Sequence, residues 1–302
     1  MLEVFNFQTE RANLEQRGGK FKFWCQDETD SLILFKEGRA GTGENWAEVV
    51  ACELAKKLLL PTAHYVFARW FDHEKEVYKD GVITRKFLAD NHTLVAGNEL
   101  LNITDPSYPM KQGRKVKQHT VRAAIAILKE VDVGKPLIET GHTMTNAIDV
   151  LAGYIIFDAL ISNTDRHHEN WGVIVTGKDT FHLCPTYDHA SSLGRNEPQE
   201  SKVRRLVSND KNQSVEHYVA NAKSAFYGTT NAKTLMTCRE AALVALSIIP
   251  RSKYWIEGIS KFTFENLNNI VKEVPTEIMT DIDKEFCIEM LLCNRNFLVS
   301  KL

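Results

Sequence analysis

The sequence predicts an α+β protein with two lobes, a small β-rich N-terminal lobe and a larger, mostly helical C-terminal lobe. In residues 1–90, polar and apolar residues alternate as they do in half-buried strands, with a single helical pattern among them. In residues 91–302, apolar residues recur mostly at helical spacing. The length of 302 residues is enough for two modest lobes with a buried core. We therefore expect the boundary between the lobes at residue 90.

The elements expected in the N-terminal lobe follow in order along the chain. Two alternating segments separated by a polar turn predict a hairpin, and a glycine-rich segment after it breaks the chain. A helix then begins, in which Trp46, Val50 and Leu54 recur at helical spacing, and Pro61 follows as a stop. The predicted elements are strands at 20–26 and 31–36, a helix at 44–60, and strands at 64–71 and 81–88.

The C-terminal lobe is predicted to contain one short hairpin among its helices. The pattern at 146–162 is long and continuously apolar, which is typical of a buried helix. The predicted elements are helices at 121–131 and 146–162, strands at 172–175 and 180–184, and helices at 215–225, 235–248, 264–271 and 282–302.

The composition is that of a folded, soluble protein, with 43% hydrophobic and 25% charged residues. The formal net charge of −2 argues against a protein that coats nucleic acid through bulk charge, so nucleic acid is not a required partner. Six cysteines without a C-x-x-C pair indicate reduced thiols rather than a disulfide framework or a zinc site. With no signal peptide and no membrane span visible, we expect a cytoplasmic protein.

The densest cluster of chemically active side chains is NTDRHHENWG at residues 163–172, between the apolar helix and the next strand. Asp165 and Asn170 have the D-x-x-x-x-N spacing of a catalytic loop that transfers phosphoryl groups. Asp188 follows the second strand of the predicted hairpin, which would return it to the same site. One carboxylate, Asp165, would orient the attacking hydroxyl, while the amide and the second carboxylate are hard oxygen ligands suited to Mg²⁺.

Phosphoryl transfer also needs a cation on the nucleotide phosphates. Lys36 ends the second strand of the N-terminal hairpin, and Glu48 on the following helix is placed to pair with it. Phe87 and Leu88 fall where the segment linking the lobes would present backbone groups to the adenine of ATP. The N-terminal lobe is thus expected to bind the nucleotide and the C-terminal lobe to carry the catalytic loop.

At these residues the sequence resembles the HipA-like serine/threonine kinases, whose site layout is shared with phosphoinositide kinases. The resemblance rests on NTDRHHENWG, on Tyr187-Asp188, and on ENWAEVVACELAKKLLLP at residues 44–61; it covers roughly residues 31–190. His189 follows Asp188 where eukaryotic protein kinases have Phe-Gly. The chain looks like a compact member without the extra N-terminal subdomain of full-length HipA toxins. Several relatives phosphorylate a serine in the loop over ATP, for which Thr9 is the nearest substitute here.

The resemblance implies a bilobal protein-kinase-like fold with ATP and Mg²⁺ as cofactors. It also implies a protein serine or threonine hydroxyl as the acceptor, and an antitoxin-type regulatory partner. The residue roles that it implies are catalytic base for Asp165, magnesium ligands for Asn170 and Asp188, and phosphate binding for Lys36.

Three other functions remain open because the catalytic residues do not identify the acceptor. A small-molecule or lipid kinase would use the same site, and a pseudokinase would hold nucleotide and regulate a partner. A metal-dependent hydrolase would use Asp165, His167 and Asp188.

Several cations near the cluster have two interpretations. Arg166 either positions Asp165 or a phosphate, or is solvated. The basic residues Lys111, Arg114, Lys115, Lys117 and Arg122 form either a solvated loop or a docking patch for an acidic partner, RNA or a phosphate. Three further basic residues follow Asp188 in the chain and are placed to contact substrate: Lys202, Arg204 and Arg205.

Overall fold

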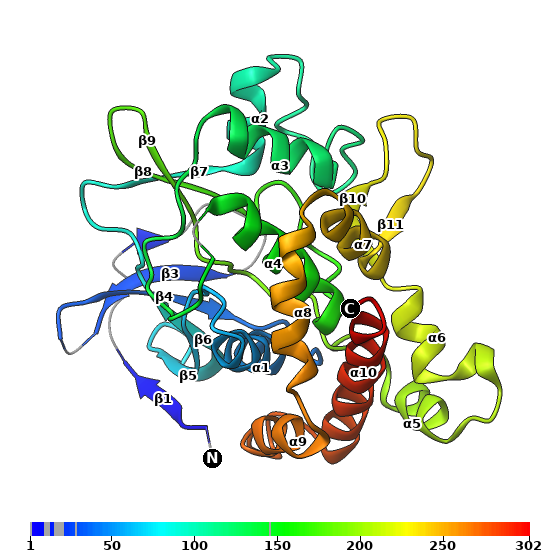
Figure 1. Ribbon diagram of the computed structural model, residues 1–302. Coiled ribbons are helices and arrows are strands. Elements are labelled where there is room, and N and C mark those ends of the chain that lie inside the picture. The colour runs from blue at the N-terminus through cyan, green and yellow to red at the C-terminus, as the bar shows by residue number, and fades with distance from the viewer. Residues whose placement is uncertain (1, 9–12, 15–20, 28, 145) are drawn as a thin grey trace.

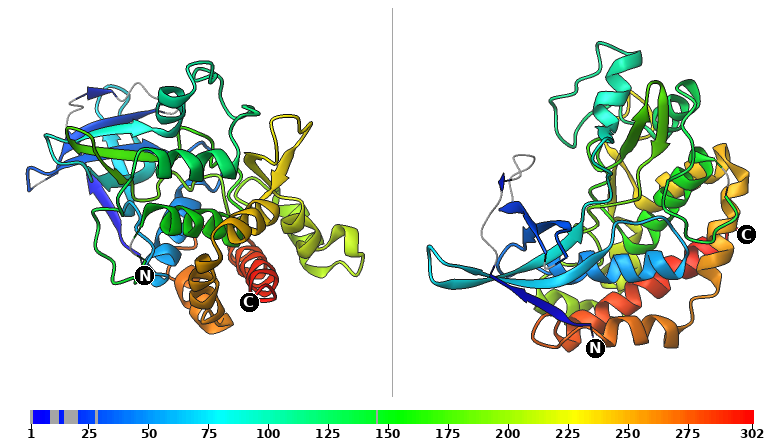
Figure 2. Two further views of the ribbon diagram at one scale, coloured as in Figure 1. Left: turned by 45° about the horizontal axis from the view of Figure 1, so that its top comes forward. Right: turned by 90° about the vertical axis from the view of Figure 1, so that its left-hand side faces the viewer.

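The computed structural model describes residues 2–8, 13–14, 21–27, 29–144 and 146–302, so Thr9 lies outside the described residues. The chain folds into a β-rich N-terminal lobe and a larger helical lobe (Figure 1 and Figure 2). The N-terminal lobe is built on a six-stranded sheet in the order β1-β5-β6-β4-β3-β2. Its strands are β1 (Val4–Phe7), β2 (Asn13–Leu14), β3 (Lys22–Gln26), β4 (Leu32–Glu37), β5 (Tyr65–Asp72) and β6 (Val77–Arg85).

The predicted hairpin is confirmed as β3–β4, in which Cys25 pairs with Ile33. The other strand pairs of the sheet are antiparallel except β1, which runs parallel to β5. One face of this sheet buries a cluster of aromatic rings: Phe7, Phe23, Phe35 and Trp70. Strand β4 is therefore held on both edges, by β3 and β6, and it carries Lys36 at a defined position.

Helix α1 (Glu44–Lys57) lies between the sheet and the helical lobe (Figure 1). Most of its side chains are buried, and its apolar residues belong to the same core cluster as those of the C-terminal helices. Side chains on this helix can therefore reach groups from both lobes.

The helical lobe is centred on α4 (Ala147–Ile161), an apolar helix whose described side chains are almost all buried. It packs against α7, α8 and α10 (Figure 1). Strand β7 precedes α2 and pairs with β8, and β8 pairs with β9. The elements of this lobe are β7 (Thr93–Ala96), α2 (Gly97–Thr104), α3 (Val121–Glu130), α4, β8 (Gly172–Gly177), β9 (Thr180–Leu183), α5 (Gln199–Val207), α6 (Val215–Ala220), β10 (Lys223–Tyr227), β11 (Leu235–Thr237), α7 (Cys238–Ile248), α8 (Lys253–Ser260), α9 (Phe264–Lys272) and α10 (Asp281–Val299).

Two predicted helices are wrong in part. The helix predicted at 215–225 ends at Ala220, and the one predicted at 235–248 begins only at Cys238. The missing residues form a two-stranded sheet, in which Lys223 pairs with Thr237. Local periodicity favoured helix, but strand pairing across the loop at 228–234 and burial of Phe226 in the core outweighed it. In the described part of the chain, no helix is long and apolar enough to cross a membrane.

Candidate active site

The loop after α4 is held at its start by a left-handed turn. Ser162, with φ of 51°, ends the helix and turns the chain toward Asn163. The amide of Asn294 on α10 donates to the Ser162 hydroxyl over 2.8 Å and to the Leu160 carbonyl over 3.0 Å. The direction in which the loop leaves α4 is therefore set by a contact from the far end of the chain.

Arg166 is a buried brace of this loop. Its guanidinium makes two bonds of 2.8 Å to the Asp158 carboxylate on α4. One nitrogen, Nη1, also donates to the carbonyls of Asn170, at 2.7 Å, and Tyr187, at 3.2 Å. The side chain is 1% exposed, so the interpretation of Arg166 as a solvated residue is wrong. Because one nitrogen contacts both carbonyls, the loop and the segment that carries Asp188 lie side by side.

Asn170 and Asn163 shape the loop around Asp165. The Asn170 amide nitrogen donates to the Asp165 carbonyl over 2.8 Å, which leaves its side-chain oxygen as an acceptor. The Asn163 oxygen accepts the backbone N–H of Asp165 at 3.1 Å, while its amide donates to Asp158 at 2.8 Å. Two asparagines thus fix the backbone on which Asp165 sits.

The Asp165 carboxylate has contacts on both oxygens. Oδ1 lies 2.8 Å from Nε of Arg114 and 4.0 Å from Nε2 of His167. Oδ2 is 3.5 Å from the Ser191 hydroxyl. Burial raises the pKa of this carboxyl above its ordinary value, and the neighbouring His167 and Arg114 side chains oppose that rise. A carboxylate in this setting is a better proton acceptor than an exposed aspartate.

Asp188 follows β9 and adopts a left-handed backbone conformation, with φ of 59°. Lys36 on β4 reaches its Oδ1 at 3.5 Å and the Tyr65 hydroxyl at 3.2 Å. Burial acts to lower the pKa of Lys36, but the attractions to Asp188, Tyr65 and Glu48 raise it well above its ordinary value. Lys36 is therefore a permanent cation in the space between the lobes.

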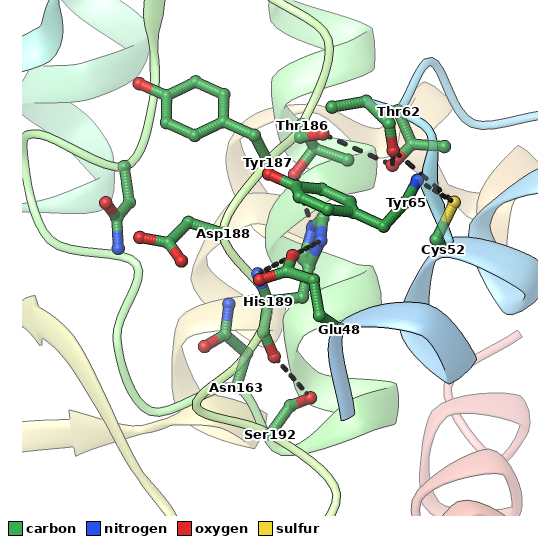
Figure 3. A network of polar contacts seen from close by, with 12 residues as sticks. Glu48, Cys52, Thr62, Tyr65, Asn163, Thr186, Tyr187, Asp188, His189 and Ser192 are labelled. Atoms are coloured by element: carbon green, nitrogen blue, oxygen red, sulfur yellow. Dashed lines mark hydrogen bonds and ion pairs between the residues drawn. The ribbon is translucent and has the colours of Figure 1, made fainter. Parts of the chain in front are cut away.

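Glu48 does not form the ion pair with Lys36 that the sequence led us to expect. Its buried carboxylate accepts the backbone N–H of His189 at 2.7 Å instead (Figure 3). The Nδ1 atom of His189 is 3.6 Å from the same oxygen, and its Nε2 contacts the Thr186 hydroxyl at 2.8 Å. The reason is the position of Glu48 on α1, which places its carboxylate against the backbone of the residue that follows Asp188. Glu48 therefore ties α1 to the residue that follows Asp188.

Phe87 and Leu88 lie in the segment between β6 and β7. Among described residues, no hydrogen bond uses their backbone N–H or carbonyl groups. The Phe87 ring stacks on that of Tyr187, with centroids 6.2 Å apart and planes inclined by 28°. This segment thus offers unused backbone groups beside an aromatic surface.

Other cations expected near the site are used elsewhere. Lys202 is buried and pairs with Asp283 on α10, and Arg205 pairs with Glu197 at 2.7 Å. The expectation that Lys202 contacts substrate is therefore wrong. The sequence reasoning also missed Arg195, which donates to Glu44 at 2.6 Å and to Ser191 at 3.1 Å. No local pattern indicates the pair with Glu44, because the two residues are 151 positions apart in sequence.

The donor set of the site fits magnesium better than zinc. The side-chain oxygens of Asn170 and Asp188 are hard ligands of the kind that Mg²⁺ takes together with substrate phosphates. In the described part of the chain, no group of three or more histidine, cysteine, aspartate or glutamate side chains is arranged to hold a metal. The alternative of a hydrolase with a metal on Asp165, His167 and Asp188 thus gains no support from the geometry.

A model of the family described as the HipA-like C-terminal domain matches residues 14–246, which is most of the chain. The chain belongs to this family. A search of curated proteins found no match to this HipA-like sequence.

Solved structures support the same fold. The Helicobacter pylori proinflammatory kinase CtkA superposes with a TM-score of 0.66 at 15% identity, over 99% of this chain and 98% of CtkA. HipA of Shewanella oneidensis MR-1, solved with HipB and its operator DNA, gives a TM-score of 0.55 at 12% identity, over 96% of this chain and 66% of HipA. The prediction of a bilobal protein-kinase-like fold is confirmed.

Proposed function

We propose that this HipA-like chain is an ATP- and Mg²⁺-dependent kinase that transfers a phosphoryl group to a serine or threonine hydroxyl of a protein. The observation that carries the proposal is the ion pair between Lys36 and Asp188, which lie 152 residues apart. A half-buried cation beside a carboxylate, with Asp165 and Asn170 in the adjoining loop, is the set of groups that phosphoryl transfer needs.

In this proposal, ATP and Mg²⁺ supply the transferable phosphoryl group and the positive charge that stabilises it. Asn170 and Asp188 hold the metal, and Lys36 contacts the phosphates. The unused backbone groups at Phe87 and Leu88 receive the adenine. These side chains position charge and do no covalent chemistry, as is usual for phosphoryl transfer.

Asp165 orients the acceptor hydroxyl and accepts its proton. Burial raises the pKa of this carboxyl, which improves it as a base. A hollow of about 360 Å³ reaches Thr164 and Ser191, two neighbours of Asp165, although Asp165 does not itself line it. The hollow is lined by Thr164 and Ser191 next to the loop, and by His217 and Tyr218 of α6. We expect the acceptor chain to enter through this hollow.

An antitoxin-type partner belongs to the same proposal, by analogy with the toxin–antitoxin system in which the Shewanella HipA is found with HipB. Nucleic acid is not required as a partner, since the chain has a net charge of only −2. The cytoplasm is the expected compartment.

The deciding experiment compares binding and transfer in matched variants. Asp165→Asn should lower the transfer rate by about 10²–10⁴-fold while ATP affinity changes only a few-fold, since the lost group acts as a base. Asp188→Asn should abolish Mg²⁺-dependent turnover. Asp179→Asn is its control, because Asp179 has a similar left-handed backbone, with φ of 57°, on an exposed turn.

Calorimetry with ATP and Mg²⁺ and phosphosite mapping by mass spectrometry after brief expression supply the readouts. ATP binding without transfer in the wild type would identify a pseudokinase. Transfer to lipids or small molecules, with no protein phosphosites that depend on Asp165, would replace the protein acceptor. Unchanged transfer in Asp165→Asn would end the kinase interpretation of this loop.

A further inference from the structure

The segment 105–119, between α2 and α3, runs along the catalytic loop and contacts it at both ends. The Tyr108 hydroxyl is 2.8 Å from Nδ1 of His168. At the other end, the Trp171 indole N–H donates to Nε2 of His119 over 3.1 Å. The loop residues that make these contacts, His168 and Trp171, are three positions apart. Together they hold the fifteen-residue segment against the loop.

These contacts are part of the buried core. His119 is 1% exposed, its Nδ1 donates to the Ala225 carbonyl over 3.0 Å, and its ring stacks on Phe226 at 4.3 Å. Val116, between the two anchors, is also buried. Tyr108, Val116 and His119 therefore fix the segment to the core, while residues 111–115 between them are exposed.

Arg114 lies between the anchors and points at the catalytic carboxylate. Its Nε is 2.8 Å from Oδ1 of Asp165, and its Nη2 donates to the Thr164 carbonyl. The neighbouring Lys111, Lys115 and Lys117 are exposed and form no ion pair with any described residue. One cation of the basic segment, Arg114, thus contacts the catalytic loop. Neither interpretation of that segment predicted this contact.

The contacts of Asp165 with Arg114 and Ser191 leave one carboxylate oxygen, Oδ2, accessible to a further hydrogen-bond partner. Oδ1 forms the ion pair with Arg114, whereas the one contact of Oδ2 within the described residues is the Ser191 hydroxyl at 3.5 Å. A contact of that length is weak and is easily replaced by a shorter one. The planar guanidinium contacts Oδ1 through Nε while its Nη2 donates to the Thr164 carbonyl, so two groups of the loop orient it at once. A lysine ammonium has no such fixed pair of donors.

We infer that Arg114 is a positioning residue for phosphoryl transfer, which holds Oδ1 of Asp165 so that Oδ2 faces the acceptor hydroxyl. The inference rests on the proposed function, since it assumes that Asp165 is the base. It assigns to the basic segment a role in the reaction instead of general docking of acidic partners.

The test compares Arg114→Ala and Arg114→Lys with Lys117→Ala, an exposed cation of the same segment. The readouts are ATP·Mg²⁺ affinity, melting temperature, and rates of transfer to dephosphorylated casein and to the protein itself. Arg114→Ala should lower the rate about 10- to 100-fold, as expected for a misplaced catalytic group, with affinity and melting temperature unchanged. Arg114→Lys should recover part of the rate, and Lys117→Ala should match the wild type.

Two measurements separate positioning from a structural role. Added methylguanidinium should partly restore Arg114→Ala, because it can occupy the vacated position. In an Asp165→Asn background, Arg114→Ala should cause no further loss, since the group it positions has lost its function.

An Arg114→Ala rate equal to the wild type overturns the inference, and a higher rate identifies Arg114 as a block on the site. A lower rate together with a lower melting temperature and no rescue assigns Arg114 to the fold alone. If the wild type and Lys117→Ala bind ATP but transfer nothing, the proposed function fails and the inference fails with it. Transfer in both, with Arg114→Ala unaffected, rejects the inference only.

Discussion

The carboxylate of Glu48 on α1 accepts the backbone N–H of His189 at 2.7 Å, across 141 residues of sequence. This bond joins the helix of the N-terminal lobe to the residue after Asp188. In our proposal, it sets where the metal-binding carboxylate stands relative to the nucleotide.

The first prediction concerns which property of Glu48 matters. Glu48→Gln keeps an oxygen that can accept the His189 N–H, so its transfer rate should stay within a few-fold of the wild type. Glu48→Ala leaves that buried N–H unpaired and should lower the rate about tenfold or more. Glu53→Ala, on the same helix but with Lys56 as its ion-pair partner, is the control. Equal losses in Glu48→Gln and Glu48→Ala would show that the charge acts on Lys36 instead.

The second prediction concerns Lys36. Lys36→Met should weaken ATP·Mg²⁺ binding and slow transfer, because the phosphates lose their cation. Lys36→Arg should restore neither fully, since a planar fork and a point charge contact phosphate differently. Lys79→Met is a close control: Lys79 lies on β6, its side chain is as exposed as that of Lys36, at 14%, and it pairs with Glu37 at 2.7 Å. Nucleotide affinity unchanged in Lys36→Met would place the nucleotide elsewhere.

The third prediction concerns stability. Arg166→Met leaves the buried Asp158 carboxylate without its charged partner and should lower the free energy of unfolding by about 3–5 kcal/mol. Arg251→Met should cost about 1 kcal/mol or less, because Arg251 is 65% exposed and lies 3.8 Å from Asp149, which is on α4 like Asp158. Chemical denaturation measures both. A loss in Arg166→Met no greater than in Arg251→Met would contradict the role of Arg166 as a brace.

The fourth prediction concerns pH. Burial lowers the pKa of His119 to about 3 from an ordinary value of 6.5. Because the pKa of His119 is lower in the folded state than in the unfolded state, the contribution of the neutral side chain to the free energy of unfolding is complete above pH 6.5. This contribution is lost as the pH falls toward 3. Below pH 6.5, His119 alone should reduce the free energy of unfolding by about 1.4 kcal/mol per pH unit.

His119→Gln should show a shallower loss of stability between about pH 6 and pH 4, whatever its stability at pH 7. His73→Gln, at an exposed position, should keep the wild-type slope. Urea unfolding across this range gives both slopes. Identical slopes in His119→Gln and the wild type would mean that His119 does not titrate as its burial requires.

Much of the fold and of the candidate site could be predicted because local patterns report local structure. Alternation identified the β3–β4 hairpin, and the unbroken apolar run identified α4. The spacing of Asp165 and Asn170, and the return of Asp188 after a short hairpin, placed three site residues in neighbouring segments. Each of these inferences needed only residues close together in the chain, where backbone geometry limits the outcome.

The partners of buried charges were decided by the tertiary structure. Glu48 contacts His189 in place of Lys36, Lys202 pairs with Asp283 inside the lobe, and Arg114 alone of its basic segment reaches Asp165. The sequence by itself determined that these side chains carry charge. Which of them meet depends on how α1, α10 and the segment before α3 pack, since a buried charge must be paired and packing decides what lies within reach.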